Sequence, residues 1–409
     1  MLVGAAKIDI TPSYSVDLSG YLFRAQPAVG VRDPIHVRAA AFESNGTRLA
    51  IISAEIIDLP RPMVEEVRQR VAQVLDTLPE HVCLSCTHTH YAPATWPLNA
   101  CGGVSRRFQL DLMDHIPRVA KDAADRLAPV RLVRGTAPLR IGRNRRNADG
   151  RPCDDTLRVL AAMGEDDRPR LLLMTYACHP VCLPPSDRQI SGDYCGVACT
   201  QLEARHDDCI AMFVNGCAGD IDPMDEYRAS PEDMRRAGRR MADAAAQVEF
   251  SDADGDALRG RYTLVNLPYE GLDPDRRREE LAGIDALDQP DSGERAKRAW
   301  LLSMLNEPYP ESMPVAVQHL CIGAVDLVTI SGEVLWGIKE QIDSAHQHLW
   351  IAAYCNGGHG YIPTTQAQDE GGYEPDSANW YYMRPPLARC AGEQLAEAAI
   401  AFMTCDPTA

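Results

Sequence analysis

The stretch His81–Pro93, HVCLSCTHTHYAP, joins a short apolar run to two closely spaced histidines. Val82–Cys86 has the length of a buried strand. At a strand end, positions i and i+2 point to the same face, so His88 and His90 can converge on one small target. Neutral imidazole is a common zinc ligand, and this pair therefore suggests a metal, although ordinary hydrogen-bonded histidines would give the same pattern.

The residues before this stretch predict the fold around it. Two strands, HVRAAAFES (36–44) and RLAIISAEII (48–57), are separated by an Asn45-Gly46 turn. Apolar residues at helical spacing then predict a helix over 61–78, which leads into the quoted strand. A strand, a helix and a second strand with polar groups at its end are typical of an open α/β sheet.

The same pattern continues along the chain. We expect further helices at about 108–127, 193–206 and 386–403. Strands are expected within 130–141, 158–163, 170–180, 209–216, 324–333 and 349–356, and a loop over 356–385. The predicted fold class is α/β, with mixed or mostly parallel sheets flanked by helices. A single domain spans 1–409 and carries a charged helical insertion or lid at about 225–310.

Composition narrows the classes of partner. The chain of 409 residues has a net charge of −17, which disfavours nucleic acid and anionic membranes and favours a small-molecule substrate. Neither a secretion signal nor a membrane span is apparent, and the 14 cysteines are scattered, so we expect a cytoplasmic protein with reduced thiols. The oligomeric state stays open, a homo-oligomer included.

Several predicted strands end in ionisable groups. These groups are His88 and His90, His179, Asp220 and Asp222, Glu333, and the nearby pair His359 and Tyr361. Because strand ends gather at one edge of a sheet, they could form one site. Two histidines and one carboxylate, with a position left for water, make a catalytic zinc site. Several ligand sets satisfy this pattern, and spacing alone does not choose among them.

Seven short motifs occur together in one order. They are GAAKIDITP (4–12), THTHYAP (87–93), GRNRR (142–146), YACHP (176–180), NGCAGDIDP (215–223), ISGE (330–333) and GYIPTTQAQDEGGY (360–373). In this combination the chain resembles the N-terminal catalytic domain of the neutral/alkaline non-lysosomal ceramidase family. The resemblance implies a ceramidase-like catalytic domain with one catalytic zinc as cofactor.

The resemblance also implies roles for individual residues. The zinc ligands would be His88, His179, Glu333 and Tyr361. His90 would bind the metal directly or hydrogen-bond to the substrate or to another ligand. Arg145 matches an active-site arginine of the family, and Tyr373 matches a tyrosine that helps to hold the reacting carbonyl oxygen.

One position departs from the family pattern. The resemblance places a serine, essential for amide cleavage in ceramidases, where this chain has Asp222. A carboxylate cannot replace a hydroxyl, but it could take a proton from a metal-bound water or grip an ammonium or hydroxyl group of a substrate. Alternatively, Asp222 only caps a turn or pairs with Arg145.

These features predict a zinc-dependent amidohydrolase-type enzyme that cleaves a C–N bond of a small polar substrate, with Asp222 as candidate base and Arg145, Tyr373 and His90 as further catalytic residues. Ceramide is not expected, because a signal peptide and room for a C-terminal domain are lacking and aromatic content is only 6%. Two alternatives stay open: a zinc-dependent lyase or isomerase in which Asp222 abstracts a proton, and a non-catalytic ligand-binding relative.

Overall fold

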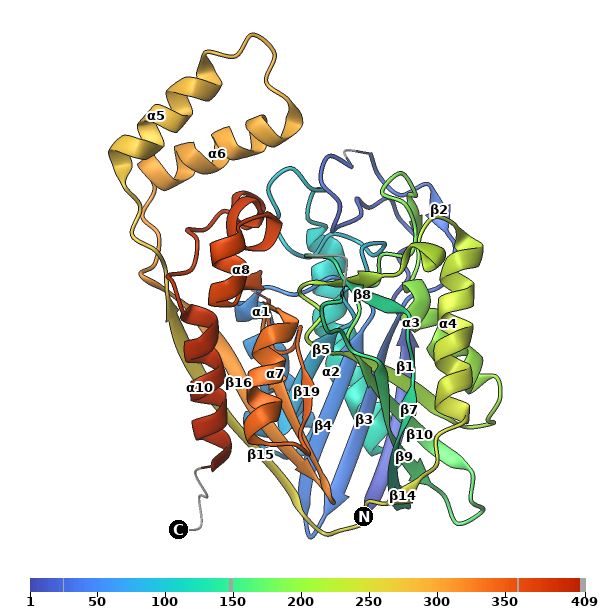
Figure 1. Ribbon diagram of the computed structural model, residues 1–409. Coiled ribbons are helices and arrows are strands. Elements are labelled where there is room, and N and C mark those ends of the chain that lie inside the picture. The colour runs from blue at the N-terminus through green and yellow to red at the C-terminus, as the bar shows by residue number, and fades with distance from the viewer. Residues whose placement is uncertain (25, 147–149, 359, 405–409) are drawn as a thin grey trace.

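The computed structural model describes residues 1–24, 26–146, 150–358 and 360–404. Sheets fill the middle of the molecule, helices cover its outer faces, and one helical hairpin projects from the top (Figure 1). The polar strand ends lie in the half of the molecule nearest this hairpin. No helix within the described ranges is long and apolar enough to cross a membrane.

The first sheet is buried on both faces. Its strand order is β5-β4-β3-β1-β6. The bounds are β1 Leu2–Asp9, β3 His36–Ser44, β4 Thr47–Ala54, β5 Val82–Cys86 and β6 Ala128–Pro129. Along β4, Ala50 and Ile52 pack under the helices α1 (Arg61–Leu75) and α2 (Arg106–Ala124), while Leu49 and Ile51 face the other sheets. Because successive side chains face opposite sides and both sides are buried, the middle of β4, from Leu49 to Ile52, is a continuous apolar run.

Two further sheets complete the body of the fold. One has the order β12-β10-β9-β7-β14, and the other has the order β15-β16-β17-β19. The bounds are β7 Arg131–Pro138, β9 Thr156–Met163, β10 Pro169–Tyr176, β12 Ile210–Asn215, β14 Ser251–Asp252, β15 Leu258–Pro268, β16 Ser312–Ile322, β17 Val325–Ile330 and β19 Trp350–Ala352. The covering helices are α3 Asp193–Glu203, α4 Pro231–Ala246, α7 Trp336–Ala345 and α10 Ala391–Thr404.

Parallel and antiparallel pairs coexist in these sheets. The pairs β4–β5, β10–β12 and β17–β19 are parallel, whereas the pairs β1–β3, β7–β9 and β15–β16 are antiparallel. The predicted α/β class with mixed sheets flanked by helices is therefore confirmed.

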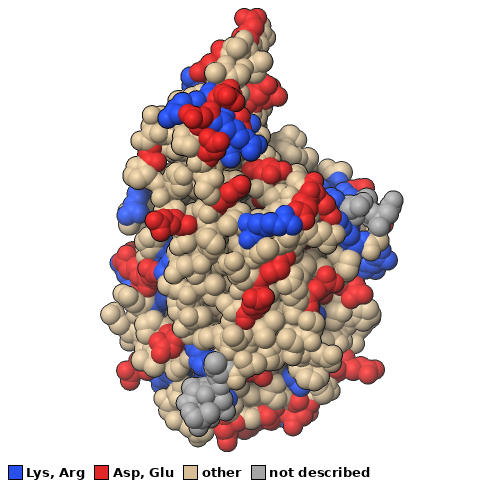
Figure 2. Space-filling view, turned by 60° about the vertical axis from the view of Figure 1, so that its left-hand side comes forward, with Lys and Arg blue, Asp and Glu red and all other residues tan. Residues whose placement is uncertain are grey.

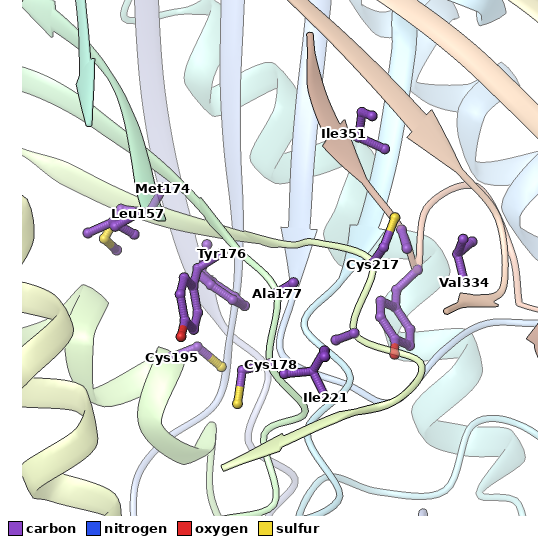
Figure 3. Packing of buried hydrophobic residues seen from close by; sticks show 14 of the residues in the cluster. Leu157, Met174, Tyr176, Ala177, Cys178, Cys195, Cys217, Ile221, Val334 and Ile351 are labelled. Carbon is purple, nitrogen blue, oxygen red and sulfur yellow. The ribbon is translucent and has the colours of Figure 1, made fainter. Parts of the chain in front are cut away.

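The largest core cluster lies beneath the polar strand ends. It joins β10 to the turn that follows β12 and to the helices α3 and α7. Figure 3 shows Cys178 and Ile221 pointing into this packed interior, with Cys195 and Tyr176 beside them. Because close-packed interiors deform little, this core fixes the backbone that leads into the polar residues above it.

The projecting hairpin consists of α5 (Pro274–Asp285) and α6 (Ser292–Asn306). It leaves and rejoins the body at one place, because β15 and β16 are antiparallel neighbours paired up to Pro268 and Ser312. Acidic and basic side chains are mixed on its surface at the top of Figure 2. Of the charged segment at about 225–310, the part before residue 269 lies in the body, where α4 packs on α3 and β15 pairs with β16.

The segment expected to be a loop at 356–385 contains regular structure, and that expectation was wrong. It holds β20 (Tyr361–Ile362), α8 (Thr365–Glu370), a π-helical turn (Tyr373–Ser377) and α9 (Ala378–Tyr382). These elements are too short for a periodic pattern to stand out. One local signal was present, since the Thr364 hydroxyl caps α8 by accepting from the Ala367 N–H.

Candidate metal centre

Three histidines and one glutamate come together from distant parts of the chain. His88 and His90 follow β5, His179 follows β10, and Glu333 begins β18 (Glu333–Val334). One ring nitrogen from each of the three histidines lies within 4.8 Å of those of the others. The Oε2 atom of Glu333 lies 3.2 Å from His88 Nε2 and 3.0 Å from His179 Nε2.

These separations match the donor spacing of a small metal site. Two ligands on a tetrahedral zinc, each about 2.0–2.1 Å from the metal, lie about 3.3 Å apart. His88 Nδ1 is 2.9 Å from the Ile57 carbonyl oxygen, and His179 Nδ1 is 3.2 Å from that of Ile221. When each Nδ1–H donates to its carbonyl, the Nε2 lone pair is available to a metal ion. Metal-binding histidines usually adopt such an arrangement, in which a hydrogen bond from the second ring nitrogen fixes the tautomer and the orientation of the ring.

His90 is the third imidazole of the group. Neither of its ring nitrogens has a hydrogen-bond partner among the described residues. The Tyr21 ring packs edge-on against it at a centroid distance of 5.0 Å. Burial, together with the neighbouring His88 and His179, lowers the pKa of His90 well below its usual value. A neutral imidazole whose two nitrogens are buried without a partner is available to a metal ion or to a bound substrate.

Glu333 is held from both of its oxygens. Burial opposes its charge, but His88 and His179 hold the pKa of the carboxyl well below its usual value. The hydroxyl of Tyr382, on α9, donates to the other oxygen, Oε1. The carboxylate is therefore ionised and fixed in one orientation.

Tyr361 lies beside Glu333 through strand pairing. The two residues are in register in the parallel pair β18–β20, and the Tyr361 ring stacks on His179 with centroids 6.4 Å apart. Its hydroxyl accepts a hydrogen bond of 3.1 Å from Arg145 Nη2. A second tyrosine, Tyr354, packs 4.4 Å from the His88 ring, and no described residue hydrogen-bonds to its hydroxyl.

Arg145 organises the polar groups around the histidines. Its Nε donates to Glu374 at 2.8 Å, Nη1 to Asp222 Oδ1 at 3.0 Å and Nη2 to the Gly219 carbonyl at 2.8 Å. Its guanidinium also lies over the ring of Tyr373, 5.6 Å from the centroid. Tyr373 is 39% exposed and contacts the Tyr361 ring, so it connects the buried group to solvent.

Asp222 is paired with two arginines. Oδ1 accepts from Arg145, and Oδ2 accepts from Arg228 Nη1 at 2.8 Å. Burial would raise the pKa of Asp222, but Arg145, His179 and Arg228 outweigh it and lower that pKa below the usual value. The nearby Asp220 has a different role: its oxygens accept from the Trp336 N–H and the Asn144 side chain, which ties the turn after β12 to its neighbours.

The backbone around the histidines is strained. His88, Tyr354 and Asn356 have φ angles of 71°, 55° and 56°, in the left-handed region that side chains other than glycine seldom adopt. Each such residue costs of the order of 1–3 kcal/mol and persists only where surrounding contacts enforce it. Asn356 is held by its side chain, which donates to Gln318 and accepts from the Leu84 N–H.

Residues 1–229 match the family model for the N-terminal part of neutral/alkaline non-lysosomal ceramidases. The chain belongs to this family. The family implies a hydrolase, and the predicted resemblance is confirmed.

Solved ceramidases share the fold of this family member. A crystal structure of the neutral ceramidase from Pseudomonas aeruginosa superposes with a TM-score of 0.75 at 20% sequence identity, covering 98% of this chain and 74% of that one. A ceramidase complexed with C2 gives a TM-score of 0.75 at 19% identity, covering 98% and 75%. No curated protein sequence matches the chain.

Motif reasoning placed the histidines and Glu333 of this ceramidase relative at strand ends, and the structure brings those side chains together. It missed Tyr354, Tyr382, Glu374 and Arg228. Glu374 directly follows a singled-out tyrosine, which could have drawn attention to it. The other three lie outside the quoted motifs or show no spacing signal. His359, noted with Tyr361, lies outside the described residues.

Proposed function

We propose that this ceramidase relative is a zinc-dependent hydrolase that cleaves the amide bond of a small polar substrate other than ceramide. The observation that carries the proposal is the convergence of His88 Nε2, His179 Nε2 and Glu333 Oε2 at the spacing of metal donors. Bound there, zinc would activate a water molecule and polarise a carbonyl group.

The proposed metal ligands are His88, His179, Glu333 and Tyr361. Tyr361 differs from the other three proposed ligands, because its hydroxyl accepts a hydrogen bond from Arg145. That bond favours an electron-rich phenol oxygen, which is compatible with a metal ligand. His90 stands beside the group with both ring nitrogens unpartnered, and it would bind the substrate or complete the ligand set.

Two residues are proposed to steady the oxyanion that forms when a carbonyl is attacked. Arg145 is fixed by Glu374 and Asp222, and Tyr373 lies across its guanidinium at the exposed side of the group. Donors held in place before the reaction stabilise developing negative charge without having to reorganise. Tyr373 is accessible enough to meet a substrate that enters from solvent.

The role of Asp222 remains the sharpest point to test. As a general base it would receive a proton from water, which suits a group whose pKa lies near the working pH. Its depressed pKa and its two arginine partners make it a weak base and favour the role of positioning Arg145. The general-base role of Asp222 stays a prediction, which kinetic measurements on a variant at this position can decide.

The chain is proposed to be one catalytic domain over 1–409 in which the α5–α6 hairpin is a lid. In the hairpin, Trp300 packs with Trp380 of α9, and its Nε1 donates to the carbonyl of Arg384, just after α9. The same helix supplies Tyr382, whose hydroxyl donates to Glu333. Replacing 272–308 by a short turn should keep the fold and the zinc but change turnover. Loss of folding would contradict this division.

The described cysteines are free thiols, which supports the proposed cytoplasmic location.

The proposal is tested by metal analysis and then by reaction in isotopically labelled water. We expect about one zinc per chain and label in the carboxylate product of an amide library. Product without solvent oxygen would indicate a lyase or isomerase instead. Zinc-loaded protein that binds library members and turns none over would indicate a ligand-binding relative.

A further inference from the structure

We infer that Arg228 is the binding residue for a carboxylate group of the substrate, so that the substrate is an acidic amide. This inference rests on the proposed function and names the substrate class of that same site. Arg228 follows the short turn Asp225–Tyr227, and its Nη1 donates to Asp222 Oδ2 at 2.8 Å.

Arg24, Arg145, Arg146 and Arg228 lie near the candidate metal centre, and their guanidinium groups differ in how many N–H donors are still free. Arg384 is buried and donates to the Tyr361 carbonyl. Arg145 uses all three of its nitrogens on Glu374, Asp222, Gly219 and Tyr361. Such a guanidinium has little capacity for a further anion.

Arg146 and Arg24 are similarly engaged. Arg146 donates to Glu374 and to the carbonyls of Ala367 and Gly371. Arg24 is buried and donates to three backbone carbonyls, at Ser19, His90 and Asp187. Both arginines therefore hold the chain together around the site.

Arg228 differs from these arginines in both its hydrogen bonds and its exposure. Within the described residues its guanidinium has one hydrogen-bond partner, Asp222, and its side chain is 35% exposed. The remaining N–H groups of its planar fork are free to bind a carboxylate through two parallel bonds.

The position of Arg228 links it to the reacting groups. Asp222, which it contacts, also binds Arg145 and directly follows Ile221, whose carbonyl accepts from the backbone N–H of His179. An anion on the free side of Arg228 would thus lie near the metal-binding group, on its solvent side.

The same contacts argue against a cationic substrate. Asp222 could have gripped an ammonium group, but both of its oxygens already accept from arginines. An ammonium group would have to share these oxygens with two guanidinium groups and would meet their positive charge. An aspartate at this position first suggests a cationic group on the substrate, whereas these contacts favour an anionic group.

Metal-anchored probes test this inference without knowledge of the natural substrate. We would measure the affinity of zinc-loaded protein for monohydroxamates of malonic, succinic and glutaric acid, for their methyl esters, and for 3-aminopropanohydroxamate. The hydroxamate binds the metal, and the tail reports on its surroundings. At the best chain length we expect the acid to bind about tenfold more tightly than its ester.

Two variants assign the preference to one residue. Arg228→Gln should lower affinity for the acid to that for the ester and leave the ester unchanged, whereas Arg228→Lys should keep part of the preference. The matched control is Arg205→Gln, because Arg205 is 34% exposed and pairs with Asp243 between α3 and α4. It should bind every probe as the unmodified protein does.

The outcomes separate this inference from the proposed function. Equal binding of acid and ester, or tighter binding of the ammonium probe, would overturn the role of Arg228 and leave the metal centre standing. A preference for the acid that survives Arg228→Gln would also overturn it. If zinc-loaded protein binds none of the hydroxamates, the metal centre fails and this inference fails with it.

Discussion

The candidate metal centre and the α5–α6 hairpin use charged residues in opposite ways. At the metal centre, buried carboxylates have several fixed partners each: Glu333 meets two histidines and a tyrosine, and Asp222 meets two arginines. On the hairpin, charged side chains are exposed or partly exposed. They pair with neighbours three or four residues away, as Asp275 does with Arg278, or across α5 and α6, as Asp285 does with Arg298.

This difference indicates where the loss of a charged side chain should have the larger effect. Removing one member of a buried, multiply bonded group leaves the others without partners in a poorly solvated place, which is costly. Removing one member of an exposed pair lets water replace it at little cost. The following substitutions should separate the two regions in this order of effect.

The largest effect is expected from substitution of the proposed metal donors. His179→Ala and Glu333→Gln should each remove stoichiometric zinc and with it the hydrolytic activity, because three or fewer donors remain. Elemental analysis after dialysis measures the zinc, and His206→Ala serves as a histidine control away from the site. A full zinc complement in both variants would refute the ligand assignment.

Asp222→Asn should act on rate rather than on zinc. If Asp222 is the general base, kcat should fall about 10²–10⁴-fold with zinc retained. If it positions Arg145, the loss should be smaller, and the pH profile of kcat/KM should keep its acid limb. An increase in KM at constant kcat would instead identify a substrate contact.

Glu55→Gln tests a buried ion pair in the first sheet, away from the hairpin. Arg38 and Glu55 are nearly inaccessible, and loss of this charge should cost about 3–5 kcal/mol at pH 7. Burial opposes the charge of Glu55, but Arg38 lowers its pKa below the usual value. Its stabilisation is therefore complete above about pH 5 and is lost as the pH falls through that lowered pKa.

Urea unfolding at several pH values measures this difference. The gap between Glu55→Gln and the unmodified protein should shrink in acid. The control Glu43→Gln removes a partly exposed pair with Arg48 in the same sheet and should change stability by less than about 1 kcal/mol. A gap that stays constant down to pH 2 would show that Glu55 is not stabilised by its charge.

The smallest effect is expected on the hairpin. Arg278→Gln breaks the exposed pair with Asp275 and should change the free energy of unfolding by less than about 1 kcal/mol, with zinc and activity unaltered. Thermal unfolding and a single activity assay are sufficient measurements. A loss as large as that of Glu55→Gln would erase the contrast between the two regions.

The sequence allowed prediction of the elements with a strong period and of the groups at their ends. The alternation in β4, the apolar face of α1 and the histidines after β5 are local patterns. Tyr354, Tyr382 and Arg228 could not be found in this way, because their relation to the histidines depends on how distant loops meet. The short elements in 356–385 escaped for the same reason: tertiary contacts, rather than their own periodicity, define them.

The spread of the proposed metal donors along the chain has a consequence for how the protein folds. His88 and Tyr361 are separated by most of the fold, and Glu333 and Tyr361 meet only when β18 and β20 pair. Contacts between residues so far apart in sequence form late, after the entropy of closing large loops has been overcome. Zinc uptake during refolding, followed as loss of zinc from a zinc-sensitive dye, should therefore lag behind the formation of secondary structure. Zinc binding would then mark the completion of folding rather than its beginning.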